Sequence, residues 1–236
     1  MRTSAIIIAG GFSKRFGRDK GLVILAGKPL IFHVTDRIST FVDETIIVLR
    51  SKEQEKAYTH LTGPKIRFAI DKCKIQSPLV GALAGFEAAS NEYSVLFPCD
   101  TPFVSTSLTQ LMFELCIGRD AVIPRWPNGN LEPLQAVYNT SAARAAALKA
   151  IEAGKLDMRS MIAYLRVRYL STLVVSQLDP EYLTFFNVNT HVDLKKAEHL
   201  LKSTHYQGSG AVSARNKRKQ IGRKKPMPFR DLQRTL

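Results

Sequence analysis

The sequence predicts an α/β protein in which helices cover both faces of a mainly parallel sheet. Short runs rich in Val and Ile alternate with helical patterns through the first 202 residues. The early runs are almost wholly apolar, which is typical of parallel strands that are buried on both faces. The length of 236 residues fits one domain, or at most one and a half.

The predicted elements alternate along this domain. Strands are expected at 4–9, 45–50, 66–70, 94–98, 120–124, 133–138, 170–175 and 185–187, with helices between them at 29–40, 51–61, 78–90, 105–117 and 139–153. Pro29 opens the first helix, because a proline in the first turn loses no hydrogen bond. Gly154 is expected to follow the end of the Ala-rich helix. Asp157 caps a further short helix, and Thr190 with Asp193 has the spacing of a capping box for the last helix.

The positive charge is concentrated at the carboxyl end. The net charge is +14, and residues 203–236 contribute eight of these charges, because they hold nine Lys or Arg and one acid, Asp231. Gly, Ser and Pro interrupt this stretch, so we predict a domain at 1–202 and a flexible basic extension at 203–236. The extension is either solvated or a docking arm for nucleic acid or an acidic protein. The stretch holds two aromatic residues, Tyr206 and Phe229, and neither lies within the basic run 215–225, which argues against specific nucleic-acid recognition.

Several classes of protein are excluded or disfavoured. No apolar run approaches the ~18 residues of a membrane span. The amino terminus enters a strand directly, without the pattern of a signal peptide, so we expect a cytoplasmic protein. The three cysteines, Cys73, Cys99 and Cys116, have the spacing of neither a disulfide framework nor a metal-binding pair.

A glycine-rich basic loop follows the first strand. Residues 6–20 read IIIAGGFSKRFGRDK. Gly10 and Gly11 at a strand end allow the backbone N–H groups to approach a phosphate, and the loop adds the cations Lys14, Arg15, Arg18 and Lys20. The pattern is neither a Walker A loop nor GxGxxG. A tight turn with solvated charges is the alternative interpretation.

An acidic loop follows a central strand. Residues 94–103 read SVLFPCDTPF, which places Asp100 just past an apolar strand. Ligands gather beyond the carboxyl ends of strands in open α/β sheets. A carboxylate that faces a phosphate-binding loop suits Mg²⁺, which is held by one or two carboxylates together with substrate phosphates. The alternative is a turn-capping Asp. We expect both Asp100 and Lys20 to be exposed, and Cys99 to be buried.

Together these segments resemble the molybdenum cofactor guanylyltransferase family. IAGGFSKRFGRDK is similar to the family's LAGGxSxRMGxDK, and CDTPF is similar to its C-D-x-P segment. NVNTHVDL at 187–194 is similar to N-[IV]-N-T-P-E-[DE]-L, and SPLVG at 77–81 is similar to GPLAG. The departures are Phe16 for Met, His191 for Pro and Ser77 for Gly. The family often has an Asn after the second strand, where Leu49, Arg50 and Ser51 stand here.

The resemblance implies a three-layer α/β/α Rossmann-like nucleotidyltransferase fold with a mostly parallel mixed sheet. It implies an enzyme that transfers GMP from GTP to the phosphate of molybdenum-molybdopterin and releases pyrophosphate. Position by position, it implies nucleotide contacts from Ile8, Ala9, Gly10, Lys20, Asp71 and Asp100. Lys20 would bind phosphates, Asp71 would lie at the base or ribose, and Asp100 would also bind Mg²⁺. Asn187 and Asn189 would face the pterin, and acceptor-binding loops would lie near 126–133.

Such a reaction needs little side-chain chemistry, because the attacking phosphate is already anionic. Positioning and electrostatics supply most of the rate in phosphoryl transfer. We therefore expect the backbone of Gly10 and Gly11, with Arg15 and Lys20, to hold the β- and γ-phosphates. Arg15, Lys20 and Asp100 are the expected catalytic residues.

Three alternatives stay open on the sequence. Two share the fold: cytidylyl transfer to molybdopterin, or guanylyl transfer to another phosphorylated metabolite. The third is a regulator or a nucleic-acid-binding protein whose basic extension is the functional part.

Overall fold

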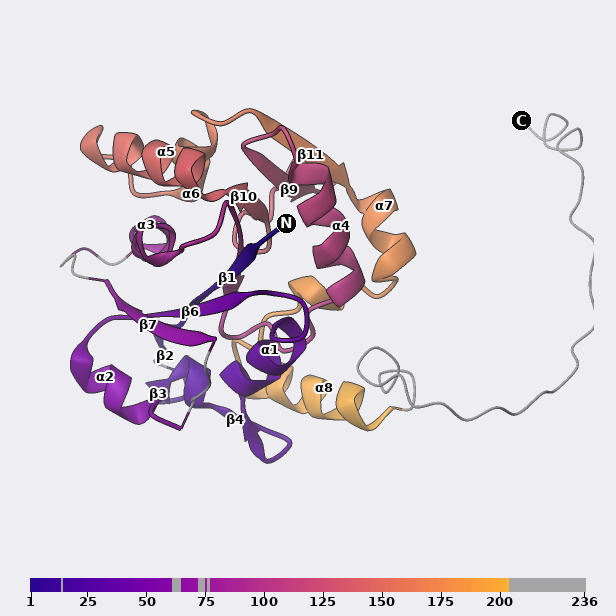
Figure 1. Ribbon diagram of the computed structural model, residues 1–236. Coiled ribbons are helices and arrows are strands. Elements are labelled where there is room, and N and C mark those ends of the chain that lie inside the picture. Colours follow the sequence, from indigo (N-terminus) through magenta and orange to yellow (C-terminus); the bar gives the residue numbers. More distant parts are fainter. Residues whose placement is uncertain (14, 61–64, 72–74, 76, 204–236) are drawn as a thin grey trace, which may run out of the picture.

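The computed structural model describes residues 1–13, 15–60, 65–71, 75 and 77–203, and Lys14, Cys73 and residues 204–236 of the basic extension lie outside this part. Within it, seven strands form one sheet in the order β11-β9-β10-β8-β1-β6-β7 (Figure 1). These strands are β1 (Thr3–Ile8), β6 (Glu44–Leu49), β7 (Ile66–Ile70), β8 (Tyr93–Pro98), β9 (Ala121–Arg125), β10 (Val137–Asn139) and β11 (Val167–Ser171). Only β10 pairs antiparallel with its neighbours in this sheet, so the predicted mostly parallel mixed sheet is confirmed.

Helices cover both faces of this sheet, as Figure 1 shows. One face carries α1 (Leu30–Ile38), α4 (Thr106–Cys116) and α7 (Thr172–Leu178), and the other carries α3 (Pro78–Ala88), α5 (Thr140–Glu152) and α6 (Met158–Ile162). α2 (Lys52–Ala57) follows β6, and α8 (His191–Lys202) closes the described chain. The predicted three-layer α/β/α class is therefore confirmed. None of the helices in the described ranges is long and apolar enough to cross a bilayer.

The alternation of side chains along β1 explains the two cores. Ala5 and Ile7 pack into one core and Ile6 into the other, and all three are fully buried. α3 approaches β1 closely at Gly85, where an added Cβ would lie 2.2 Å from Cγ2 of Ile6. Glycine at this position therefore lets α3 lie against the central strand.

A third cluster fixes the segments at the carboxyl edge of the sheet. Val188, which precedes α8, and Ala197 within α8 are fully buried against a cluster that includes Phe103, beyond the end of β8. The other buried members of the cluster are Val23, directly after the 3₁₀ turn η1 (Lys20–Leu22), Leu25 in the hairpin of β4 (Ile24–Leu25) and β5 (Lys28–Pro29), and Leu30 at the start of α1. A second small hairpin, of β2 (Phe12–Ser13) and β3 (Arg18–Asp19), precedes η1.

Three predicted strands are wrong in part or in whole. Residues 172–175 begin helix α7, because the Ser171 side chain accepts the backbone N–H of Leu173 at 3.2 Å and caps it. Residues 133–135 form a turn in which Gln135 N–H donates to the Glu132 carbonyl at 3.2 Å, so only the end of 133–138 is strand. Residues 185–187 leave the 3₁₀ turn η2 (Leu183–Phe185) without forming a strand.

The predicted caps are confirmed. The Asp157 carboxylate accepts the N–H of Ser160 at 3.0 Å and starts α6. At α8 the Thr190 hydroxyl accepts the N–H of Asp193 at 3.1 Å and donates to the Asp193 carboxylate at 2.8 Å. That carboxylate also accepts the N–H of Asn189 at 3.1 Å, so the cap fixes the residues just before α8.

Candidate active site

A cavity of about 470 Å³ opens at the carboxyl edge of the sheet, beside the ends of β1 and β8. Six of the residues expected at the site line it: Ile8, Gly11, Lys20, Asp100, Asn187 and Asn189. They come from the glycine loop, the acidic loop and the segment before α8, which are far apart in the sequence. The fold therefore gathers these three motifs, and Pro78 of the fourth motif, SPLVG, also lines the cavity.

The glycine loop presents backbone donors at the end of β1. Ala9 N–H still pairs with the Val48 carbonyl at 2.9 Å, which extends the ladder of β1 and β6 by one bond. The N–H groups of Gly10 and Gly11 have no acceptor among the described residues. No atom lies within 4 Å of the place of a Gly11 Cβ, so the missing side chain leaves this part of the cavity open. At Gly10, in contrast, a Cβ would meet Cγ of Arg50 at 2.7 Å.

Lys20 connects the glycine loop to the acidic loop and to the segment before α8. Its N–H donates to the Gly11 carbonyl at 3.2 Å, which closes the loop back toward its start. Its ammonium group forms an ion pair with the Asp100 carboxylate and donates to Oδ1 of Asn189 at 2.5 Å. The Asp100 carbonyl accepts the N–H of Val188 at 2.9 Å, so the acidic loop and the segment before α8 are also joined through the backbone.

The expectation that Lys20 and Asp100 are exposed is wrong. Asp100 is only 4% exposed, and the Lys20 side chain is 22% exposed. A buried carboxylate without a partner would be costly, and the Lys20 ammonium supplies that partner. The expected burial of Cys99 is confirmed, and burial raises the pKa of its thiol.

A network that sequence reasoning missed holds Asp19, the neighbour of Lys20. The Asp19 carboxylate accepts the Tyr58 hydroxyl at 2.5 Å, the N–H of Gly21 at 3.0 Å and the side-chain amide of Gln54. The Gln54 amide also donates to the Ala9 carbonyl at 2.8 Å. Burial raises the pKa of Tyr58, so its hydroxyl stays protonated as a donor. Gln54 and Tyr58 thus connect α2 and its carboxyl end to both ends of the glycine loop.

The acidic groups of the cavity fit a divalent cation that is shared with a phosphate ligand. Across the described ranges, no group of three or more His, Cys, Asp or Glu side chains is placed to hold a metal by itself. Asp100 supplies one buried carboxylate beside the glycine loop. This donor set suits Mg²⁺, which usually keeps waters and is bound by one or two carboxylates and substrate phosphates.

Four of the expected site residues do not line the cavity. Ala9 is fully buried behind it, and Gly10 lies under the Arg50 side chain. Arg15 is exposed in the turn between β2 and β3. Asp71 is half-buried just after β7, where its N–H donates to the Leu49 carbonyl at 2.7 Å. Asp71 therefore lies at the same edge of the sheet as the cavity but does not line the cavity.

The opposite wall was only partly anticipated. It includes Glu132 and Gln135 from the chain between β9 and β10, and Met158 at the start of α6. Sequence reasoning placed acceptor loops near 126–133 but did not single out Gln135. The available signal was a polar pair beyond the carboxyl end of a central strand, where ligands gather.

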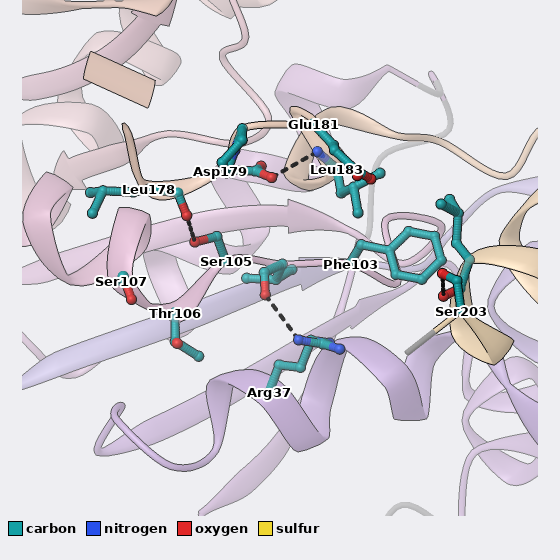
Figure 2. Close-up of a pocket in the computed structure, with 13 residues that line it drawn as sticks. Arg37, Phe103, Ser105, Thr106, Ser107, Leu178, Asp179, Glu181, Leu183 and Ser203 are labelled. Atoms are coloured by element: carbon teal, nitrogen blue, oxygen red, sulfur yellow. Dashed lines mark hydrogen bonds between the residues drawn. The ribbon is translucent and has the colours of Figure 1, made fainter. Parts of the chain in front are cut away.

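A second cavity, of about 300 Å³, lies between α1, the start of α4 and the chain that follows α7 (Figure 2). Several of its polar groups are bonded within the wall. The Asp179 carboxylate accepts the N–H of Leu183 at 3.0 Å, and Arg37 donates to the Val104 carbonyl at 3.5 Å. Ser105 caps α4. These groups brace the fold, whereas the first cavity gathers donors and charges that face open space.

The fold and the first cavity together define a class of enzyme. A mostly parallel sheet with a glycine loop, a cation and a carboxylate at its carboxyl edge is the arrangement of a nucleotidyltransferase. Residues 5–170 match the family model described as the MobA-like NTP transferase domain. The chain belongs to this family, which confirms the predicted enzyme class.

Relatives and solved structures agree with this assignment. The chain is 34% identical over 198 residues to a probable molybdenum cofactor guanylyltransferase of Methanosarcina mazei, covering 81% of this chain and 88% of that protein. It is 32% identical over 210 residues to the molybdenum cofactor guanylyltransferase of Desulfosudis oleivorans, covering 85% and 96%. The crystal structure of molybdopterin-guanine dinucleotide biosynthesis protein A from Archaeoglobus fulgidus matches with a TM-score of 0.71 and 28% identity, covering 84% and 98%.

Proposed function

We propose that this enzyme transfers GMP from GTP to the phosphate of molybdenum-molybdopterin. An oxygen of the acceptor phosphate attacks the α-phosphorus of GTP, the bond to the β-phosphate bridging oxygen breaks, and pyrophosphate leaves. The names of the relatives support the two substrates. The observation that carries the chemistry is the Lys20–Asp100 ion pair beside the glycine loop. In that loop the N–H groups of Gly10 and Gly11 have no acceptor among the described residues.

The residues of the cavity suit this step, because it needs charge stabilisation and no base. The N–H groups of Gly10 and Gly11 would donate to phosphate oxygens, and Lys20 would neutralise the β- and γ-phosphates. Arg15 would reach the distal phosphates from its exposed turn, and Asp71 would lie at the base or ribose. On the other side, Asn187 and Asn189 would face the pterin, as both line the cavity.

We propose Mg²⁺ as the cofactor, with Asp100 as its protein ligand. When bound, the ion would neutralise charge on the phosphates of GTP and on the departing pyrophosphate. The support is the single buried carboxylate beside the glycine loop, which fits a metal that is shared with substrate.

The choice of nucleotide is tested by thermal unfolding in the presence of GTP or CTP, with and without Mg²⁺. We expect GTP to raise the melting temperature, because only a ligand that binds the folded state stabilises it. Mg²⁺ should enlarge the shift, and CTP should give little. A larger shift with CTP would contradict guanylyl transfer and would favour cytidylyl transfer on the same fold.

Gly11 and Gly21 are expected to respond differently to alanine. The added Cβ at Gly11 would enter open cavity, so Gly11→Ala should change stability by less than about 1 kcal/mol. It should weaken GTP binding about tenfold or more, because one methyl group in a pocket has effects of this size. At Gly21 the Cβ would lie 2.4 Å from the Tyr58 hydroxyl, so Gly21→Ala should cost about 1–3 kcal/mol. Urea unfolding and GTP titration of both variants test this contrast, and equal stability losses would contradict it.

We also propose that residues 1–202 are the catalytic domain, acting in the cytoplasm, and that the basic extension at 203–236 is dispensable for chemistry. α8 ends at Lys202 and packs through Ala197 and Leu201 onto the third cluster. A chain truncated after Lys202 should therefore keep its melting temperature and its GTP affinity. An unfolded truncated chain, or one that no longer binds GTP, would contradict the proposal.

A further inference from the structure

The cavity wall opposite Gly11 contains a buried amide without a partner. Gln135 lines the cavity and is 3% exposed, yet its side chain makes no hydrogen bond within the described residues. Buried polar side chains are nearly always hydrogen-bonded, because an unsatisfied one costs about 1–3 kcal/mol. A ligand that occupies the cavity would satisfy this group.

Glu132 lies in the same wall and is held from behind. The indole N–H of Trp126 donates to its Oε1 at 2.6 Å, and no interaction of Oε2 occurs in the described part of the chain. The Trp126 ring packs against Tyr182 and Phe185, with ring centroids 5.2 and 5.8 Å apart. Burial raises the pKa of Glu132, since the carboxylate is partly removed from water. The wall therefore fixes a carboxylate that still has acceptor capacity.

The backbone of this wall is anchored at both ends, which keeps Glu132 and Gln135 in place. Glu132 N–H donates to the Pro124 carbonyl at 3.0 Å, at the end of β9. The Ala136 carbonyl accepts the N–H of Leu96 in β8 at 3.0 Å. Between them, the Tyr138 hydroxyl donates to the Pro133 carbonyl at 2.7 Å. Such preorganisation lowers the entropy cost of binding.

Apolar groups surround the polar pair. Pro133 and Leu134 lie between Glu132 and Gln135 in the sequence, and all four line the cavity together with Met158. Apolar contacts with a few fixed polar groups are typical of sites for small heteroaromatic ligands. The polar pair combines a carboxylate, which accepts two hydrogen bonds side by side, with an amide, which donates as well as accepts.

We propose that Glu132 and Gln135 recognise the 2-amino-4-oxopyrimidine edge of the pterin ring in the acceptor. The Glu132 carboxylate accepts the ring N–H and the 2-amino group, and the Gln135 amide donates to the 4-oxo group. The inference rests on the proposed function. Guanine has the same edge, but the wall lies beyond β9, on the side of Asp100 away from the glycine loop of β1. The place next to that loop is the one expected for the nucleotide.

The test is Glu132→Gln in the full-length protein, with Gln135→Leu as a second variant. Glutamine keeps the volume of Glu132 and an oxygen for the Trp126 indole, so the fold should be retained. Exposed Glu87 in α3 supplies the control, Glu87→Gln. Four quantities are measured for each protein: the KM for molybdenum-molybdopterin at saturating GTP, and the Kd values for GTP, pterin and lumazine. Lumazine carries an oxo group in place of the 2-amino group.

We expect wild type and Glu87→Gln to bind pterin about tenfold or more tightly than lumazine, as expected for hydrogen bonds to a charged group. Glu132→Gln should lose this preference and raise the acceptor KM by a similar factor, with the Kd for GTP unchanged. Gln135→Leu should also raise the acceptor KM. Unfolding curves identify a variant that fails to fold, and in that case the other variant decides.

Each contrary result has a distinct meaning. An unchanged acceptor KM and unchanged pterin preference in both folded variants would overturn the inference but leave the proposed function intact. A raised Kd for GTP with an unchanged acceptor KM would assign the edge to guanine and overturn the pterin assignment. A wild-type protein that binds GTP but neither binds pterin nor uses molybdenum-molybdopterin would overturn the proposed function together with the inference.

Discussion

Replacing Asp100 by Asn is expected to lower turnover by about 10²–10³-fold, the usual loss when one preorganised electrostatic contact is removed. The Asn side chain keeps the shape of Asp100, but its oxygen is a poorer ligand for Mg²⁺. The fold should survive, because the backbone bond from Val188 to the Asp100 carbonyl remains and the Lys20 side chain is exposed enough to be solvated.

Turnover and the Mg²⁺ dependence of GTP affinity are the measurements for Asp100→Asn. GTP should still bind through the glycine loop, but its affinity should no longer rise with added Mg²⁺. Turnover near that of wild type, or an unchanged effect of Mg²⁺, would contradict the metal assignment. The role of Asp100 would then be limited to the ion pair with the Lys20 ammonium group and to closing a turn.

Replacing Lys20 by Ala is expected to reduce both GTP affinity and stability. The ammonium is placed to neutralise distal phosphates, so the variant should lose more affinity for GTP than for GMP. It also leaves the Asp100 carboxylate, at 4% exposure, without its cation. Removing one partner so that a buried group is unsatisfied costs about 1–3 kcal/mol, and more for a charged group. An exposed Lys20, as expected from the sequence, would have had little effect on stability, since surface substitutions usually lie within about ±0.5 kcal/mol.

A double-mutant cycle separates these two roles of Lys20. In the Asp100→Asn background no buried charge is left behind, so Lys20→Ala should cost much less stability there. Urea unfolding of the four proteins gives the coupling, and titration with GTP and GMP gives the phosphate contribution. Equal losses of GTP and GMP affinity would show that Lys20 does not reach the distal phosphates. Equal stability losses in both backgrounds would contradict the ion-pair argument.

The local patterns predicted most of the fold because each depends on neighbouring residues. The apolar runs of β1 and β6, and the caps at Asp157 and Thr190, are set by spacing within a few residues. α7 was missed because its β-branched Thr and Val residues favour a strand, and the Ser171 cap decided otherwise. The short β10 is set by pairing with both β8 and β9, which no local pattern contains.

The site residues that belong to a sequence motif were predictable, but the contacts between distant chain segments were not. The residues of the glycine and acidic loops were identified, but the Lys20–Asp100 ion pair joins positions 80 residues apart and depends on the closing of the β2–β3 hairpin. The bond of Tyr58 to Asp19 likewise connects the end of α2 to the loop across 39 positions. Gln135 gave only the weak signal of a polar pair with Glu132 beyond a strand end, because a buried glutamine resembles a surface one in sequence.

Guanylyl transfer is tested most directly by following the α-phosphate of the nucleotide. The full-length protein is incubated with Mg²⁺, molybdenum-molybdopterin and GTP labelled at the α-phosphate, with α-labelled CTP in a parallel reaction. We expect the label from GTP to appear in a dinucleotide product with release of one pyrophosphate for each transfer, and the label from CTP to stay in CTP. Transfer from CTP instead of GTP, or no transfer from either to this acceptor, would contradict the account.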